Sequence, residues 1–183
     1  MHLHSNRIHL RTINKEHAKE VFDYRSDAKT NQYQGWIPKN LNDVYDFIKH
    51  KVSKTIDETD SWYQLVIVNK ENNKVIGDIG IHFLNEDKKQ VEIGYTLAKY
   101  YHGKGFACEA LSEIMRFLFT DLNKHRIIAS VDPANLKSIA MLERLGFRKE
   151  AHFIKSILID GEWRDDIVYA ILKKEWINNT NPD

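Results

Sequence analysis

The segment most diagnostic of the fold is Tyr101-His102-Gly103-Lys104-Gly105-Phe106-Ala107-Cys108-Glu109-Ala110-Leu111, where two glycines precede an amphipathic run. Apolar residues after the glycines recur at helical spacing as far as Leu118. The preceding residues Gln90–Leu97 indicate a strand, so the order is strand, glycine loop, helix. Unpaired N–H groups at a helix start favour a phosphate, and glycines let it come close. The pattern predicts a site for a phosphorylated cofactor, although a plain strand-to-helix turn also fits it.

Two better-known phosphate loops do not match this segment. A Walker-type loop ends in Gly-Lys-Ser or Gly-Lys-Thr, whereas Gly105-Phe106 follows Lys104 here. A dinucleotide-binding fingerprint requires a third glycine, where this chain has Cys108. The glycine loop is therefore of another kind.

Composition limits the class of protein. With 183 residues, 42% of them hydrophobic, we expect residues 1–183 to form a single domain with a sizeable core. The formal net charge of +1 disfavours a nucleic-acid partner. No apolar run approaches membrane-spanning length, and no signal-peptide core stands at the N-terminus, so we expect no membrane partner. The single cysteine precludes an intrachain disulfide, and we expect a cytoplasmic protein.

Hydrophobic periodicity divides the chain into strands and helices in the order β-α-α-β-β-β-α-β-α-β-β, a mixed α+β arrangement with an antiparallel meander followed by a βαβ unit. The seven predicted strands are Arg7–Ile13, Trp62–Asn69, Val75–Leu84, Gln90–Leu97, Arg126–Val131, Phe153–Ile159 and Trp163–Leu172. The four predicted helices are one capped by Asn14 that reaches Arg25, one over 44–52, one from the glycine loop to about Asp121, and Asn135–Leu145, ended by Gly146. Turns are expected at 71–74, 85–89 and 160–162.

A second segment, Asn135-Leu136-Lys137-Ser138-Ile139-Ala140-Met141-Leu142-Glu143-Arg144-Leu145-Gly146-Phe147, gives the chain a family resemblance. Together with the glycine loop it resembles the GCN5-related N-acetyltransferases. That family has a Gln/Arg-x-x-Gly-x-Gly/Ala loop, followed later by Asn-x-x-Ser/Ala and by Leu-Gly-Phe. Gly103 and Gly105 match the glycines, Tyr100 stands at the Gln/Arg place, and Asn135 and Ser138 match the later signature.

Within that family the chain looks most like the ribosomal-protein N-terminal acetyltransferases. The similar segments are His102-Gly103-Lys104-Gly105, Glu92-Ile93-Gly94-Tyr95 and Arg7-Ile8-His9-Leu10-Arg11, and the resemblance covers nearly the whole chain. It implies a mostly antiparallel seven-stranded sheet with flanking helices. It also implies acetyl-CoA as co-substrate and a primary amine acceptor, either a protein N-terminus or a small amine. The strands Gln90–Leu97 and Arg126–Val131 are then expected to diverge and admit the pantetheine arm.

The expected cofactor site combines the glycine loop with the second segment. Loop N–H groups are expected to hold the pyrophosphate, and Asn135 and Ser138 the pantetheine arm. Lys104 is alternatively an exposed loop lysine, and Asn135 is alternatively, or also, a helix N-cap. The predicted cofactor-binding residues are Leu97, His102, Gly103, Lys104, Gly105, Phe106, Ala107, Asn135 and Ser138.

The predicted catalytic residues are Glu92 and Ser138. By resemblance, Glu92 draws the proton from the amine, directly or through water; alternatively it is an exposed strand glutamate paired with a lysine. Asp78 and His82, on the previous strand, are reserve candidates for the base. The family often places a tyrosine acid where this chain has Leu142. Ser138 or water then replaces it, or the thiolate leaves unprotonated.

Tyr33 and Trp36 are predicted to contact the substrate together with the hairpin tip 160–164, although ordinary packing also explains both aromatic residues. We expect no metal, because the histidines at His2-Leu3-His4 and at His125 have no further ligand at useful spacing. A homodimer is compatible with the sequence. The alternative function is a non-catalytic acyl-CoA-binding or sensor module, favoured by Leu142; a plain α+β interaction domain is a third reading.

Overall fold

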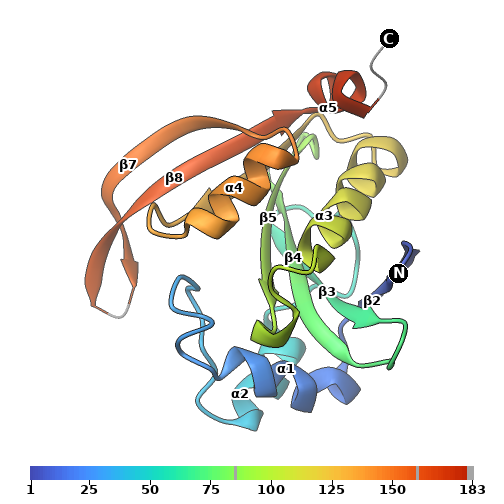
Figure 1. Cartoon of the computed structure of the whole chain (residues 1–183), viewed down its shortest axis with the longest axis vertical. Coiled ribbons are helices and arrows are strands. Elements are labelled where there is room, and N and C mark those ends of the chain that lie inside the picture. The colour runs from blue at the N-terminus through green and yellow to red at the C-terminus, as the bar shows by residue number, and fades with distance from the viewer. Residues whose placement is uncertain (85, 160, 181–183) are drawn as a thin grey trace.

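The computed structural model describes residues 1–84, 86–159 and 161–180, which form one eight-stranded sheet with helices on both faces (Figure 1). The strand order is β1-β2-β3-β4-β5-β6-β8-β7, and β5 and β6 are parallel while the other neighbours are antiparallel. The strands are β1 (His2–His4), β2 (Ile8–Thr12), β3 (Ser61–Asn69), β4 (Val75–Leu84), β5 (Gln90–Leu97), β6 (Arg126–Val131), β7 (Arg148–Ile159) and β8 (Glu162–Leu172). The helices are α1 (Ala18–Arg25), α2 (Leu41–His50), α3 (Phe106–Arg116), α4 (Leu136–Arg144) and α5 (Lys173–Thr180).

The mixed class, the element order and the mostly antiparallel sheet are confirmed, but the count of seven strands is wrong. The additional strand β1 pairs with β2 through His2↔Arg11, Leu3↔Leu10 and His4↔His9. Three residues are too few for alternation to stand out in a sequence. Asn85 and Asp160, which belong to predicted turns, lie outside the described residues.

Two differences concern the C-terminal part of the chain. Strand β7 begins at Arg148 rather than Phe153, because most of its residues are exposed and give no clear alternation. Helix α5 was not predicted, since its polar sequence has little periodicity. The ring of Trp176 anchors it at 5.4 Å from that of Phe119. No helix in the described ranges is both long and apolar enough to cross a membrane.

The two faces of the sheet carry different helices. Strand residues alternate between faces; Val91, Ile93, Tyr95 and Leu97 of β5 pack in one cluster with α3 and Leu142 of α4. The opposite face is covered by α1 and α2, whose Val21 and Val44 cluster with Val66 and Val68 of β3. Glu92, Gly94 and Thr96 therefore project from β5 toward the α1–α2 side.

A buried ion pair fixes α1 to the sheet. Both carboxylate oxygens of Asp78, on β4, accept hydrogen bonds from the Arg25 guanidinium, at 2.7 Å each. The Asp78 side chain is fully buried, and that of Arg25 nearly so. Burial opposes the charge on Arg25, but the adjacent Asp78 outweighs it and raises the pKa of the guanidinium. The pair is bidentate, which fixes orientation as well as distance.

The pairing of β5 with β6 is short. It consists of Gln90↔Arg126, Val91↔Ile127 and Glu92↔Ile128. Strand β4 nevertheless pairs with β5 as far as Leu97, and β8 pairs with β6 as far as Val131. Beyond Glu92 the two strands therefore run on without pairing to each other. The predicted divergence is confirmed; the place where β5 and β6 run on unpaired is called the wedge below.

The substitution Asp78→Asn is expected to reduce the free energy of unfolding by about 3–5 kcal/mol, because it leaves a buried guanidinium without its counter-charge. Urea denaturation measures this loss. The control Glu113→Gln breaks a more exposed pair with Arg116 and is expected to cost at most about 1 kcal/mol. Equal losses in the two variants would contradict the importance of the buried pair.

Candidate active site

The glycine loop adopts a conformation that requires its glycines. Gly103 and Gly105 have φ values of 73° and 80°, in the left-handed region that side-chain-bearing residues rarely adopt. Gly105 is the N-cap of α3. Within the described part of the chain, no hydrogen-bond acceptor meets the N–H groups of the five residues Gly103, Lys104, Gly105, Phe106 and Ala107. The loop therefore presents a row of free donors at a helix N-terminus.

His102 differs from the prediction. Its backbone N–H donates to the Lys99 carbonyl at 3.1 Å and is not free for a ligand. Its ring nitrogen Nε2 lies 2.7 Å from the Leu97 carbonyl oxygen. His102 thus ties the loop to the end of β5. The Lys104 ammonium lies 3.7 Å from the centre of the exposed Tyr100 ring.

Arg7 is a residue of this site that the sequence did not single out. Its Nη1 donates to the Lys104 carbonyl at 2.9 Å, and its Nε donates to Glu109 at 2.7 Å. The guanidinium also lies 4.3 Å from the centre of the Phe106 ring. Glu109 accepts two more hydrogen bonds, from the Ser5 hydroxyl and the Arg7 N–H. The β1–β2 turn therefore holds the glycine loop in place from outside.

Tyr95 is a second residue that was missed. Its hydroxyl is hydrogen-bonded to the Ser138 hydroxyl across the wedge, so a β5 side chain meets α4. Burial raises the pKa of the Tyr95 phenol to about 12, against the opposing effect of the Ser138 hydrogen bond. The phenol therefore remains protonated at neutral pH. The signal in the sequence is its place in Glu92-Ile93-Gly94-Tyr95, two residues before the predicted end of the strand at 97.

The remaining α4 residues are where the sequence placed them. The Asn135 side chain caps α4 by accepting the Ser138 N–H at 3.3 Å, so the N-cap interpretation holds. Leu142 is fully buried in the cluster under α3. The Leu142 side chain is part of the hydrophobic core, so this position cannot supply a proton.

Glu92 lies on the other face of the sheet from Tyr95 and Ser138. Its side chain is 30% exposed, and its carboxylate is 3.6 Å from Nδ1 of His82. Nε2 of His82 lies 3.4 Å from the exposed carboxylate of Asp60, and the His82 ring stacks on that of Trp62 at 4.7 Å. The second reserve candidate, Asp78, has both oxygens occupied by Arg25 and is not available as a base.

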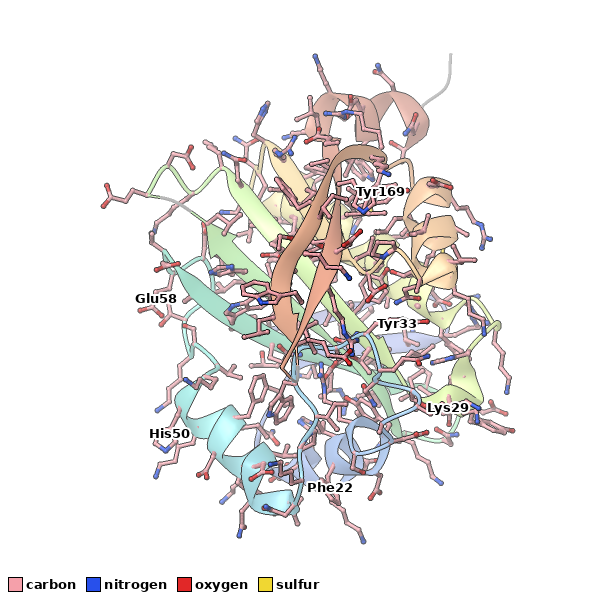
Figure 2. The ribbon with its side chains drawn as sticks, turned by 90° about the vertical axis from the view of Figure 1, so that its left-hand side faces the viewer. Phe22, Lys29, Tyr33, His50, Glu58 and Tyr169 are labelled. Atoms are coloured by element: carbon pink, nitrogen blue, oxygen red, sulfur yellow. The ribbon has the colours of Figure 1, made fainter. Side chains whose placement is uncertain are left out.

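The segment between α1 and α2 crosses the wedge. The Tyr33 hydroxyl donates to the Ala134 carbonyl at 3.3 Å, and the Gln34 amide donates to the Tyr95 carbonyl at 3.2 Å. Arg164 of β8 donates to the Gln32 carbonyl, and Figure 2 shows Tyr33 beneath the β7–β8 hairpin. Trp36 instead stacks on Phe47 at 4.5 Å within the α1–α2 cluster. The contacts of Trp36 are thus those of ordinary packing.

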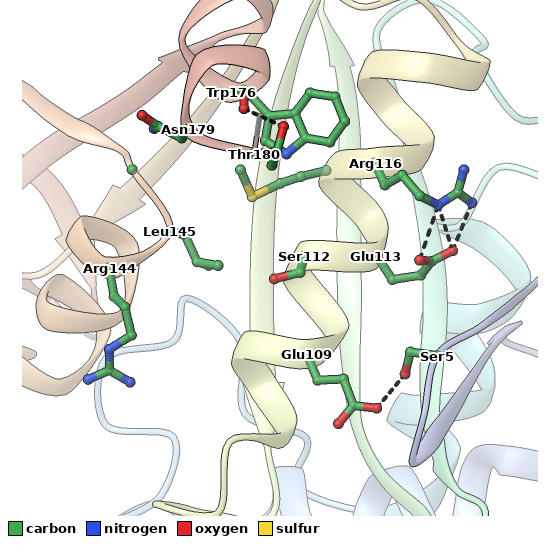
Figure 3. A pocket seen from close by; sticks show the side chains of 12 residues that line it. Ser5, Glu109, Ser112, Glu113, Arg116, Arg144, Leu145, Trp176, Asn179 and Thr180 are labelled. Carbon is green, nitrogen blue, oxygen red and sulfur yellow. Dashed lines mark hydrogen bonds and ion pairs between the residues drawn. The ribbon is translucent and has the colours of Figure 1, made fainter. Parts of the chain in front are cut away.

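A groove of about 690 Å³ lies beside α3 on the face of Tyr95 and Ser138 (Figure 3). It is bounded by Glu109 and Ser112 of α3, by the end of α4 at Arg144, and by Trp176 of α5. Its acids are paired, Glu109 with Arg7 and Glu113 with Arg116. Among the described residues, no group of three or more His, Cys, Asp or Glu is placed to hold a metal ion.

A split sheet beside a loop of free N–H groups fits a phosphorylated coenzyme whose arm enters the sheet, and comparisons with known proteins agree. A family model described as Acetyltransferase (GNAT) domain matches residues 7–148. The uncharacterized N-acetyltransferase YnaD of Bacillus subtilis is 31% identical over 176 residues, covering 96% of this chain and 99% of that protein. The ribosomal protein uS5-alanine N-acetyltransferase of Escherichia coli is 38% identical over 84 residues, covering 46% and 43%.

Solved structures agree on the fold. An acetyltransferase (GNAT family) from Bacillus anthracis has a TM-score of 0.84 at 27% identity and covers 96% of this chain and 100% of that one. A spermidine N-acetyltransferase from Vibrio cholerae, in complex with CoA and spermine, has a TM-score of 0.80 at 20% identity and covers 95% and 100%. The chain belongs to the GNAT acetyltransferase family and is an acyltransferase of the N-acetyltransferase class.

The substitution Glu109→Gln is expected to make the free energy of unfolding depend less on pH in the acid range. Burial disfavours the charged carboxylate, but the hydrogen bonds from Ser5 and Arg7 outweigh it and hold the pKa of Glu109 below its usual 4.5. A lowered pKa in the folded state adds stability above pH 4.5 that is lost as the pH falls further. Urea denaturation between pH 3 and pH 7 measures the difference, and Glu162→Gln at an exposed site is the control. Parallel curves for Glu109→Gln and wild type would contradict the role of Glu109.

Proposed function

We propose that the chain transfers an acetyl group from acetyl-CoA to a primary amine. The observation that carries this proposal is the row of free N–H groups at Gly103–Ala107, at the end of the strand that borders the wedge. Aimed N–H dipoles at a helix start bind a pyrophosphate without further charge. The pantetheine arm then lies between β5 and β6, next to Leu97, Asn135 and Ser138. The adenosine end extends toward the groove beside α3, whose rim carries Arg144.

The coenzyme supplies an acetyl thioester; the residues of the chain position it and handle the protons. Glu92, or a water that it orients, accepts one proton of the acceptor ammonium, so that the nitrogen lone pair can form the new N–C bond. As the C–S bond breaks, the nitrogen loses its second proton to water. Tyr95, protonated at neutral pH and hydrogen-bonded to Ser138, is proposed to give its proton to the departing sulfur and to regain one from water. Ser138 acts by orienting the Tyr95 hydroxyl. Positioning contributes much of the rate.

The acceptor is a protein N-terminus or a small amine. The E. coli relative acts on the alanine of a ribosomal protein, and the V. cholerae structural neighbour acts on spermidine, so both classes occur among similar proteins. Tyr33 lies on the segment that crosses the wedge and is proposed to contact the acceptor, with Trp36 supporting that segment from below. Residues 1–183 act as one domain, proposed to work in the cytoplasm without nucleic acid or membrane. A homodimer remains compatible with this proposal.

A non-catalytic acyl-CoA-binding or sensor module is the second candidate, because Leu142 leaves α4 without a phenol. Thiol release from acetyl-CoA, measured against a panel that includes an alanine-starting peptide and spermidine, tests the two. Turnover with any amine supports the enzyme. Binding of acetyl-CoA without turnover on any amine supports the sensor.

Gly105→Asp is expected to abolish binding of acetyl-CoA. The side chain adds a negative charge where the pyrophosphate is proposed to lie, at a φ of 80°. Isothermal titration calorimetry measures the affinity. Gly161→Asp is a matched control, since Gly161 has a φ of 81° and open space around it but lies at the β7–β8 turn. Unchanged affinity in a folded Gly105→Asp variant would overturn the loop assignment.

Glu92→Gln is expected to lower turnover by roughly 10²–10⁴-fold while the affinity for acetyl-CoA stays near wild type, because general-base catalysis is lost and the shape is kept. Steady-state rates over a pH series measure the fall in turnover. They also show whether the rise of the pH–rate profile that reports ionisation of the base disappears in the variant. If most of the rate and the same pH profile remain, the base is His82 or bulk water, and positioning carries the catalysis.

Tyr95→Phe is expected to lower kcat more than it changes KM for acetyl-CoA, because the ring and its packing remain while the proton donor to the sulfur is lost. The effect should shrink when the leaving thiol is made more acidic, as in an aryl thioester analogue. Thiol-release kinetics with both donors measure it. An equal loss with either thioester would mean that Tyr95 is structural.

A further inference from the structure

Two histidines of the N-terminal hairpin are hydrogen-bonded to each other. His4 of β1 pairs directly with His9 of β2, and the Nδ1 atoms of the two rings are 2.6 Å apart. At this distance one Nδ1 carries a proton and the other accepts it. The contact therefore holds while at least one ring is neutral. It is lost when both rings are protonated, because both Nδ1 atoms are then donors.

The groups around this pair disfavour further protons. The charged or titratable neighbours of His9 are His2 and His4 of β1, Arg11 of β2, and Lys70 after β3. Burial, followed by the charges of Lys70 and its other neighbours, lowers the pKa of His9 from the usual 6.5. A lowered histidine pKa in the folded state adds stability that is present above pH 6.5 and is lost as the pH falls below it.

The turn of the same hairpin holds the glycine loop. Glu109, in the first turn of α3, accepts hydrogen bonds from the Ser5 hydroxyl and from the backbone N–H and Nε of Arg7. Figure 3 shows the Ser5 contact. Nη1 of Arg7 donates to the Lys104 carbonyl at 2.9 Å. The position of the hairpin turn therefore affects the backbone from which the free N–H groups project.

Lys70 connects the histidine pair with the turn. Its ammonium donates to the Ser5 carbonyl at 2.5 Å, and its charge opposes a proton on His9. When His4 and His9 are both protonated, they repel each other and this ammonium, so the contact that closes the turn is weakened. Strand β1 has three residues and lies at the edge of the sheet, where local opening costs little.

We propose that the His4–His9 pair makes the affinity for the coenzyme depend on pH. Above pH 6.5 the pair is closed, and the turn keeps Arg7 on the glycine loop. At lower pH a second proton opens the pair, Arg7 loses its position, and the N–H groups of Gly103–Ala107 no longer match a pyrophosphate. The inference rests on the proposed binding of acetyl-CoA and adds its regulation. His4 and His9 are positioning residues, since they act through Arg7.

Calorimetric titration of CoA between pH 5.5 and pH 8 tests the proposal. The wild-type affinity is expected to fall on acidification by roughly 5-fold or more beyond any fall in His4→Asn or His9→Asn. In each variant an amide can still bond to the remaining ring but takes up no proton. The comparison cancels the titration of the coenzyme's own phosphate, which is common to all proteins. Buffers contain EDTA, because neighbouring imidazoles can bind stray metal ions.

His2→Asn is the matched control. His2 lies two residues before His4 on the same exposed face of β1, and its ring centre is 6.4 Å from that of His4. The His2→Asn variant is therefore expected to keep the wild-type dependence of CoA affinity on pH.

The substitution Arg7→Gln tests the connection to the loop. It is expected to weaken CoA at pH 8, and adding His4→Asn to it should then change the pH dependence no further. A double variant with a clearly flatter pH profile than Arg7→Gln alone would overturn the route through Arg7.

Linkage provides a readout in the unaltered chain. If protons on the pair weaken CoA, then CoA must make the pair harder to protonate by the same factor. NMR titration of the imidazole Cε1–H signals is expected to show a lower apparent pKa for the His4–His9 pair in the CoA-loaded chain than in the free chain. The apparent pKa of His2 should stay the same.

Equal pH profiles of CoA affinity in wild type, His4→Asn and His9→Asn would overturn the inference. So would an apparent pKa of the pair that CoA leaves unchanged. Melting temperatures at pH 8 show that each variant is folded. Failure of the proposed function looks different: CoA binding without release of thiol from acetyl-CoA overturns the transfer alone, and no CoA binding at any pH overturns both.

Discussion

The structure depends on the early end of the β5–β6 pairing. After Glu92↔Ile128 the two parallel strands separate, yet each keeps its other neighbour, β4 for β5 and β8 for β6. Both walls of the wedge are therefore ordered although their facing backbone groups lack a strand partner. Such groups need hydrogen bonds from elsewhere; the Gln34 amide meets the Tyr95 carbonyl. A ligand with amide groups of its own can take the same place.

The glycine loop follows directly from this constraint, because β5 leads into it. His102 binds the last carbonyl of the strand, and Arg7 holds the Lys104 carbonyl from the β1–β2 turn. With Glu109 neutralised by Arg7, the first turn of α3 keeps its free N–H groups without an opposing free carboxylate. The N-terminal strands, distant in sequence, thus contribute to the electrostatics of the loop.

Local features of the site were predictable from the sequence, and long-range ones were not. The positive φ of Gly103 and Gly105 and the Asn135 cap are requirements of a turn and a helix start, which short segments encode. The Tyr95–Ser138 bond depends on how far α4 comes back toward the split strand, and the two residues are 43 apart. Asp78 is a reasonable base candidate from the sequence alone. The structure shows that its carboxylate is bound by Arg25, which lies 53 residues earlier in the chain. The alternation of side chains along β5 predicts which residues share a face of the sheet, but it does not predict which helices cover each face.

The alternation along β5 carries a consequence for the chemistry. Glu92 and Gly94 project to the α1–α2 face, whereas Tyr95 projects to the face of α3 and α4 and meets Ser138 there. If the thioester lies between β5 and β6, the acceptor comes from one side of the sheet and the coenzyme leaves from the other. The proton removed from the amine and the proton given to the sulfur are then handled by groups separated by the strand itself.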